Sequence, residues 1–96
     1  MKIPNKINVS GYTLTVKYGK KILVNGVECF GVYNPNTKII SLTKGMSPTR
    51  KKEIFIHEYL HFLEDIYRIK ISEEGVSSIA LGLLAMLNNE KVNLND

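Results

Sequence analysis

The sequence predicts an α+β fold in a single domain, with strands in the first half of the chain and two helices in the second. Between residues 12 and 42, apolar runs and period-two alternation of apolar and polar side chains are typical of strands. Between residues 48 and 88, apolar side chains recur every three or four positions, as on a helix with one buried face. A length of 96 residues fits one domain, so we treat 1–96 as a single unit.

Four strands are expected, at residues 12–18, 22–24, 27–33 and 38–42. Asn25-Gly26 is a strong tight-turn dipeptide between the second and third of them. The Asn- and Pro-rich stretch that follows Tyr33 predicts a hairpin between the last two. Gly31, inside the third strand, indicates a bulge or a close approach to the backbone. We expect residues 1–10 and 89–96 to be frayed.

Two helices follow, and each has its own start signal. Ser47 is a side-chain N-cap and Pro48 suits the first helical position, so the first helix begins there and runs to about Arg68. Ser72 caps the second helix, which extends to about residue 89. The predicted core-facing residues are Ile56, Tyr59, Leu60, Leu63 and Tyr67 in the first helix, and Val76, Ile79, Ala80, Leu83 and Leu87 in the second.

Composition and charge argue against several classes of protein. The chain has no apolar run like a signal-peptide core, and no segment near the ~20 apolar residues that cross a bilayer. We therefore expect a cytoplasmic protein without a membrane partner. A single cysteine, Cys29, excludes an internal disulfide, and we expect it to be a small apolar residue in a strand. The net charge is +4, but the basic residues are scattered and Glu53 follows the cluster Arg50-Lys51-Lys52, which favours solvated surface over nucleic-acid binding.

The stretch "FIHEYLHFLED", residues 55–65, holds both histidines of the chain, His57 and His61, with Glu58 directly after the first. Residues four apart on a helix lie on the same face, so both imidazoles can bind one zinc ion. Glu58 would lie near that ion without binding it, which is the position of a general base. We therefore expect zinc to lower the pKa of a bound water, and Glu58 to accept the proton of that water as it attacks a carbonyl.

A catalytic zinc usually has three protein ligands, so a third ligand must come from elsewhere in the chain. Cys29, in a strand, is a poor candidate. Glu64 and Asp65 lie on the same helix as the histidines, further along it, so it would be difficult for either to bind the same ion. Either could instead form a hydrogen bond with a histidine that binds the ion. Glu73 and Glu74 begin the second helix, which a helix hairpin brings back toward the first. Glu73 lies on the apolar, inward face and is favoured, but the residues alone leave Glu74 open.

His57-Glu58-Tyr59-Leu60-His61, followed by a glutamate at the head of a second helix, resembles the gluzincins. The most similar are the minigluzincins and the ImmA/IrrE-type metallopeptidases, many of which are carried by phages. In these families the glutamate helix often reads E-x-x-V-D, which Glu73 to Ser77 resembles with Glu73 as the ligand and serine in the last place.

The resemblance implies a zincin-like domain, with a short antiparallel sheet followed by an active-site helix and a glutamate helix. It implies zinc-dependent hydrolysis of a peptide bond in a peptide or protein substrate that lies extended along an edge strand. Residues 38–42 are the candidate edge strand.

Two other functions compete with this one. The chain could be a catalytically silent zinc-binding module that acts on a partner protein such as a repressor, or a basic nucleic-acid binder.

For the peptidase reaction, Tyr33 and Tyr67 are candidates for stabilising an oxyanion, although a plain core or surface role is favoured for each.

Overall fold

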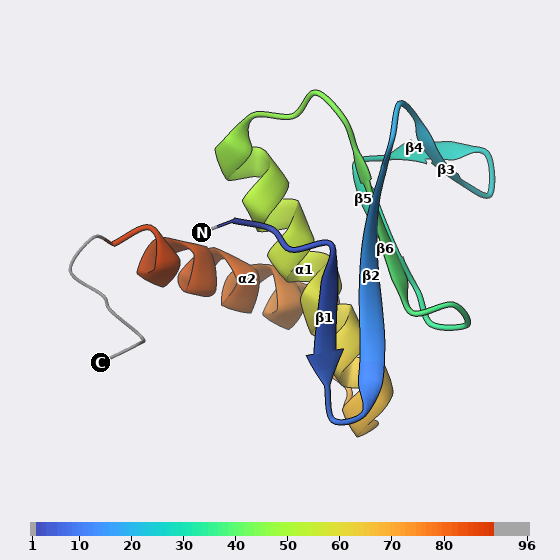
Figure 1. Cartoon of the computed structure of the whole chain (residues 1–96). Helices are drawn as coiled ribbons and strands as arrows, with labels where there is room; N and C mark the ends of the chain where they lie inside the picture. The colour runs from blue at the N-terminus through green and yellow to red at the C-terminus, as the bar shows by residue number, and fades with distance from the viewer. Residues whose placement is uncertain (1, 90–96) are drawn as a thin grey trace.

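The computed structural model describes residues 2–89 and confirms the α+β class. The elements are β1 (Lys6–Val9), β2 (Tyr12–Gly19), β3 (Ile22–Val24), β4 (Val27–Cys29), β5 (Gly31–Asn34), β6 (Ile39–Thr43), α1 (Pro48–Tyr67) and α2 (Glu73–Leu87). Helix α1 lies between the main sheet and α2 (Figure 1), in contact with β5 and β6 as well as with α2. Both helices begin where the sequence predicted, because the side chains of Ser47 and Ser72 accept the capping hydrogen bonds.

The main sheet is mixed, whereas an antiparallel sheet was expected. Its strand order is β1-β2-β6-β5, with β2 and β6 parallel and the other neighbours antiparallel. The β3–β4 hairpin forms a separate two-stranded sheet. The expectation that residues 38–42 form an edge strand is wrong, because β6 lies inside the sheet between β2 and β5. Within the described residues, β1 and β5 are the edges of the main sheet.

The start of the chain is more ordered than expected. Residues 6–9, predicted to be frayed, form β1 and pair with β2 from Lys6 with Thr15 to Val9 with Tyr12. Ser10 and Gly11 both have positive φ, 50° and 84°, as a two-residue hairpin turn requires. Residues 90–96, which were also predicted to be frayed, lie outside the residues that the structure describes.

The expected strand 27–33 is divided into β4 and β5, with Phe30 between them. The Asn25-Gly26 turn is confirmed, with φ values of 52° and 80°. Cys29 ends β4 and is half-buried, which agrees with a structural role in a strand. The break at Phe30 lets β4 turn away with β3 while β5 continues along β6 (Figure 1).

The hydrophobic core lies between the sheet and α1 and continues between α1 and α2. Its buried side chains are Leu14, Val16, Tyr33, Ile40, Leu42, Phe55, Ile56, Leu60, Phe62, Val76, Ala80 and Leu84. The stripe predicted for α1 is partly wrong, because Phe62 outside it is fully buried while Tyr67 inside it is 50% exposed. The reason is that α1 contacts two partners, so its buried surface is wider than one stripe. Ile79 of α2, predicted to face the core, is exposed.

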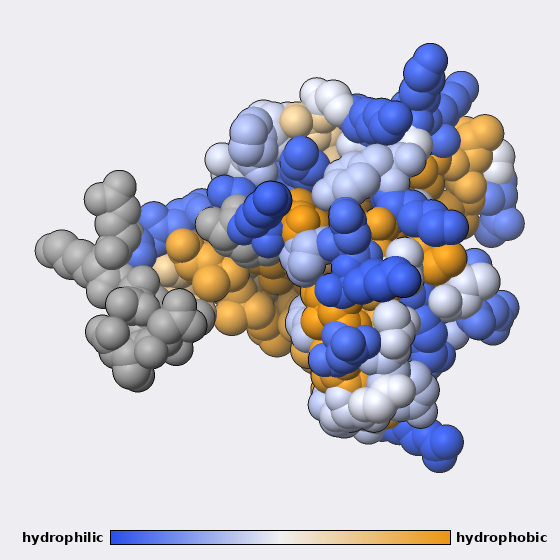
Figure 2. Space-filling view, viewed as in Figure 1, coloured by the Kyte–Doolittle hydropathy of each residue, from blue (hydrophilic) through white to orange (hydrophobic). Residues whose placement is uncertain are grey.

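Several apolar side chains remain on the surface. They gather over α2 and near the β3–β4 hairpin (Figure 2), and include Leu23, Val27, Leu81 and Met86. None of the helices within residues 2–89 has the length and apolar character needed to cross a membrane.

Gly31 of β5 lies close to a side chain of α1. A Cβ here would lie 2.5 Å from Cγ2 of Ile54 and 3.0 Å from Cδ2 of Leu42. The close approach predicted at this position is therefore confirmed, and the approaching atoms belong to side chains of α1 and β6.

We expect Gly31→Ala to lower the free energy of unfolding by about 1–3 kcal/mol. The cause is steric, because Cγ2 of Ile54 is fixed to a β-branched carbon close to the helix backbone and has little freedom to move. Gly82→Ala is the control, since its added Cβ meets no atom within 4 Å and should stabilise α2 by about 0.5–1 kcal/mol. Urea denaturation measures both, and an unchanged stability of Gly31→Ala would contradict this packing.

Candidate metal centre

His57 and His61 lie one turn apart on α1, as the spacing predicted, with ring centroids 5.0 Å apart. His57, Glu58 and His61 each offer one ligand atom, and these atoms all lie within 4.8 Å of one another. The histidine side chains are 21% and 29% exposed and that of Glu58 is 14% exposed, so the group sits in a partly buried position open to small solutes. A group of this composition can hold a metal ion.

Glu73 is brought to the two histidines by the start of α2. Its Oε1 lies 2.8 Å from Nε2 of His57, and its Oε2 lies 3.4 Å from Nε2 of His61. The shorter contact is a hydrogen bond, and the two oxygens of the carboxylate each face one of the two imidazoles. The hydrogen bond with His57 is the main cause that holds the pKa of Glu73 below its ordinary value. Glu74, the alternative, is exposed and makes no hydrogen bond or ion pair with either histidine.

Glu58 lies beside the histidines and is held by the edge of the sheet. The backbone N–H of Tyr33 on β5 donates to its Oε1 at 2.9 Å, while its Oε2 lies 4.0 Å from Nε2 of His57. Burial raises the pKa of Glu58, and the neighbouring His61 and His57 and the bond from Tyr33 oppose that rise. One carboxylate oxygen is therefore fixed by the backbone and the other faces the histidines.

Glu64 orients His61 from the side opposite to Glu73. Its Oε1 lies 2.7 Å from Nδ1 of His61, and its Oε2 accepts the backbone N–H of Ile71 at 2.9 Å. A carboxylate on Nδ1 fixes the ring so that Nε2 points toward Glu73. Glu64 and Asp65 were both predicted as possible hydrogen-bond partners of a histidine. Glu64 contacts His61, whereas Asp65 contacts Tyr33 and Lys38.

The short loop between the helices determines where Glu73 lies. Helix α1 ends at Tyr67, one residue before the expected end, and Arg68 adopts a left-handed conformation with φ of 54°. The backbone N–H groups of Arg68 and Ile69 both donate to the carbonyl oxygen of Glu64. Ser72 then caps α2 through the N–H of Gly75. Glu73 follows directly after this cap, so the end of one helix and the start of the next fix its position.

The tyrosines considered for oxyanion stabilisation have other partners. The hydroxyl of Tyr33 donates to Oδ2 of Asp65 at 2.6 Å, and that of Tyr67 lies 2.5 Å from Oγ of Ser10. Burial and Asp65 raise the pKa of Tyr33 above its ordinary range. Tyr33 contributes to the site through its backbone N–H. Sequence reasoning could not identify this group, because every residue except proline has one.

Comparison of the chain with protein-family models, with curated proteins and with solved structures finds no match.

A network around Asp65 ties the β5–β6 hairpin to α1. Nζ of Lys38 donates to Oδ2 of Asp65 at 2.8 Å and to the carbonyl oxygen of Pro35 at 2.7 Å, beside the bond from Tyr33. The bonds from Lys38 and Tyr33 hold the pKa of Asp65 below its ordinary value. A carboxyl whose pKa is lower in the folded state adds stability above its unfolded pKa of ~3.9 and loses it as the pH falls through the folded pKa.

We expect Asp65→Asn to lower the free energy of unfolding by about 1 kcal/mol at neutral pH, a modest value because the pair is partly exposed. The difference from the wild type should shrink below about pH 4, where the carboxyl itself becomes protonated. Urea denaturation at several pH values measures this difference. Glu28→Gln, at an exposed carboxylate of β4, is the control and should show none. A difference for Asp65→Asn that stays constant down to about pH 2 would contradict the assignment.

Proposed function

We propose that this chain is a zinc-dependent peptidase in which His57, His61 and Glu73 hold the metal and Glu58 is the general base. The observation that carries the proposal is the meeting of the two Nε2 atoms with the carboxylate of Glu73, at 2.8 and 3.4 Å. Two imidazoles and a carboxylate on two helices form a donor set that suits zinc and leaves room for a further ligand. The resemblance of the His57–His61 motif to the gluzincins points to the same reaction.

A bound zinc supplies Lewis-acid polarisation of a carbonyl and a lower pKa for a water molecule. Side-chain and backbone groups of the protein transfer the proton and hold the reacting groups in position. Oε2 of Glu58 accepts a proton from the attacking water and passes it to the leaving amine nitrogen. The N–H of Tyr33 keeps Glu58 in place by holding its Oε1, and Glu64 keeps the ring of His61 in its orientation.

Strand β5, instead of β6, is then the strand along which a substrate would lie. Thr43 donates to the carbonyl oxygen of Phe30, so the backbone groups of Phe30 face β6. In an antiparallel pair these directions alternate, and the backbone groups of Gly31 and Tyr33 therefore face away from β6. On that side the N–H of Tyr33 already donates to Oε1 of Glu58. An extended peptide added to this edge would pass beside the proposed general base.

A second candidate is a metal-binding module without turnover that acts on a partner protein. The hydrogen bond from Tyr33 to Glu58 favours this candidate in one respect, because it occupies one oxygen of the carboxylate proposed as the base. Both candidates require the same metal site, so two separate experiments are needed.

Metal content tests the site. We expect about one zinc per chain in the wild type, and a loss of zinc in His61→Ala and in Glu73→Ala, because each removes one of three ligands. Glu74→Ala is the matched control and should retain zinc, since that side chain does not contact the histidines. Metal analysis after purification without chelator measures this. A wild type that takes up no zinc when supplied with it, or a loss restricted to Glu74→Ala, would contradict the assignment.

Glu58→Gln tests the reaction. The amide keeps the size of the side chain but accepts no proton, so we expect zinc to be retained and cleavage of a peptide library to fall by about 10²–10⁴-fold. Mass spectrometry of the library products, with zinc measured in the same samples, gives both quantities. Cleavage by Glu58→Gln at the wild-type rate would rule out the role of Glu58. A zinc-loaded wild type that cleaves nothing would favour the silent binding module.

A further inference from the structure

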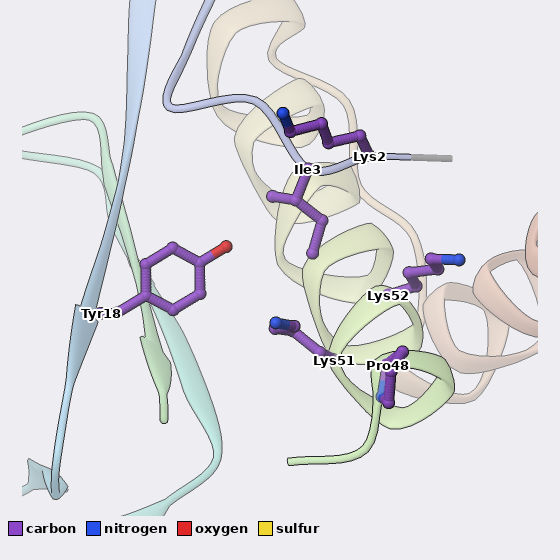
Figure 3. Close-up of a pocket in the computed structure, with 6 residues that line it drawn as sticks. All are labelled: Lys2, Ile3, Tyr18, Pro48, Lys51 and Lys52. Atoms are coloured by element: carbon purple, nitrogen blue, oxygen red, sulfur yellow. The ribbon is translucent and has the colours of Figure 1, made fainter. Parts of the chain in front are cut away.

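A second candidate site lies at the beginning of α1. A cleft of about 380 Å³ opens between the first turns of α1, strand β2 and the chain that leads to β1 (Figure 3). Its lining residues are Lys2, Ile3, Tyr18, Pro48, Lys51 and Lys52. Half of them are lysines and none is acidic, and the volume falls in the range of small-molecule sites, ~300–1,000 Å³.

The lysines of this cleft have no carboxylate partner within the described part of the chain. The ion pairs made there by lysine and arginine are Lys38 with Asp65 and Arg50 with Glu53. Lys51 and Lys52 are half-buried, although the cluster that contains them was expected to be solvated surface. Three lysines around one cleft, with no carboxylate of residues 2–89 paired to them, give it a positive potential.

The position of these charges on the helix adds to this potential. The first turn of α1 contains no acidic residue, and Lys51 and Lys52 follow directly after it. A helix N-terminus carries partial positive charge, which makes lysine unfavourable nearby and an anion favourable. Both sources of positive potential favour a negatively charged ligand in the cleft.

The remaining lining is apolar. The ring of Tyr18 stands across the cleft from Ile3 and Lys51 (Figure 3), and Nζ of Lys51 lies 5.7 Å from its centroid. Ile3 and Pro48 add aliphatic surface beside it. An aromatic ring next to ammonium groups, with Nζ of Lys51 already over its face, suits a ligand that combines a planar ring with an anionic group.

We propose that this cleft binds a small organic phosphate. Its planar part lies against Tyr18, its phosphate contacts the ammonium groups of Lys2 and Lys51, and Lys52 raises the local positive potential. Lysine binds phosphate as a point charge and needs no fixed fork geometry.

This site is separate from the metal centre. Lys51 precedes His57 by six positions, which places it about 9 Å along the helix and about 120° around it. The proposal therefore stands independently of the peptidase function, and its test requires no metal.

The test is a titration of the protein with adenosine monophosphate and with inorganic phosphate, followed by the backbone amide resonances in solution NMR. Both ligands should give saturable shifts at residues 2, 18 and 51, and adenosine monophosphate should bind roughly tenfold more tightly because its base stacks on Tyr18. Tyr18→Leu should remove most of that advantage and leave phosphate binding nearly unchanged.

The charge of the cleft is tested by a matched pair of variants. Lys2→Gln with Lys51→Gln should weaken both ligands by roughly tenfold or more. The control, Lys6→Gln with Lys17→Gln, removes the same charge from the other face of the sheet, since Lys6 pairs with Thr15 and Lys17 alternates with Tyr18. The control should bind as the wild type does.

Three results would overturn the proposal. They are the absence of saturable shifts in the wild type, equal weakening in the control variant, and adenosine monophosphate that binds no more tightly than phosphate.

Discussion

The rest of the structure depends on the apolar packing of helix α1, which is buried on one side by the main sheet and on another by α2. On one side, the fully buried ring of Phe62 meets Tyr33 of the sheet in an edge-on arrangement, with centroids 5.7 Å apart. On another side, α1 packs against α2. Burial of one such aromatic residue contributes ~1.5–3 kcal/mol, more than a typical single hydrogen bond. Apolar packing therefore decides how α1 is rotated, and the rotation leaves His57, Glu58 and His61 together on the remaining sector.

Hydrogen bonds from the backbone then fix the finer geometry of that sector. Glu58 and Glu64 are both partly buried carboxylates, which are costly to bury without partners. Each has a main-chain partner, the N–H of Tyr33 for Glu58 and the N–H of Ile71 for Glu64. Both main-chain groups belong to segments packed on α1, the edge strand and the loop between the helices. The bonds that hold these segments in place are thus the same bonds that orient the candidate site.

Local signals in the sequence predicted the parts that depend on local physics. The two serine caps and the spacing of His57 and His61 follow from rules that span four or five residues. The parallel pairing of β2 with β6 and the inner position of β6 could not be predicted this way. They depend on which strands meet across the intervening chain of residues 20–38, and alternation along a strand does not determine its neighbour.

The same distinction applies to single residues. Glu73 was favoured over Glu74 because helical periodicity placed it on the inward face of the second helix. Of the two it alone contacts the histidines, but the inward position is wrong, since its side chain is 71% exposed. Phe62 was missed because one stripe was assigned to a helix that has two buried sides. The N–H of Tyr33 carries no sequence signal, since every non-proline residue has one.

Glu73 differs from the other three site residues in what holds it. Its side chain is 71% exposed and it stands on α2, while the other three belong to α1 and are mostly buried. Its position therefore depends on the loop 68–72, through the left-handed turn at Arg68 and the bond from Ile71 to Glu64.

A metal held by His57, His61 and Glu73 would join α1 to α2 across this loop and add its binding free energy to the folded state alone. In a domain with so small a core, that contribution is comparable to the net stability of the chain. The proposed ion and the helix hairpin therefore depend on each other. The loop brings Glu73 to the histidines, and an ion bound there would oppose the separation of the two helices.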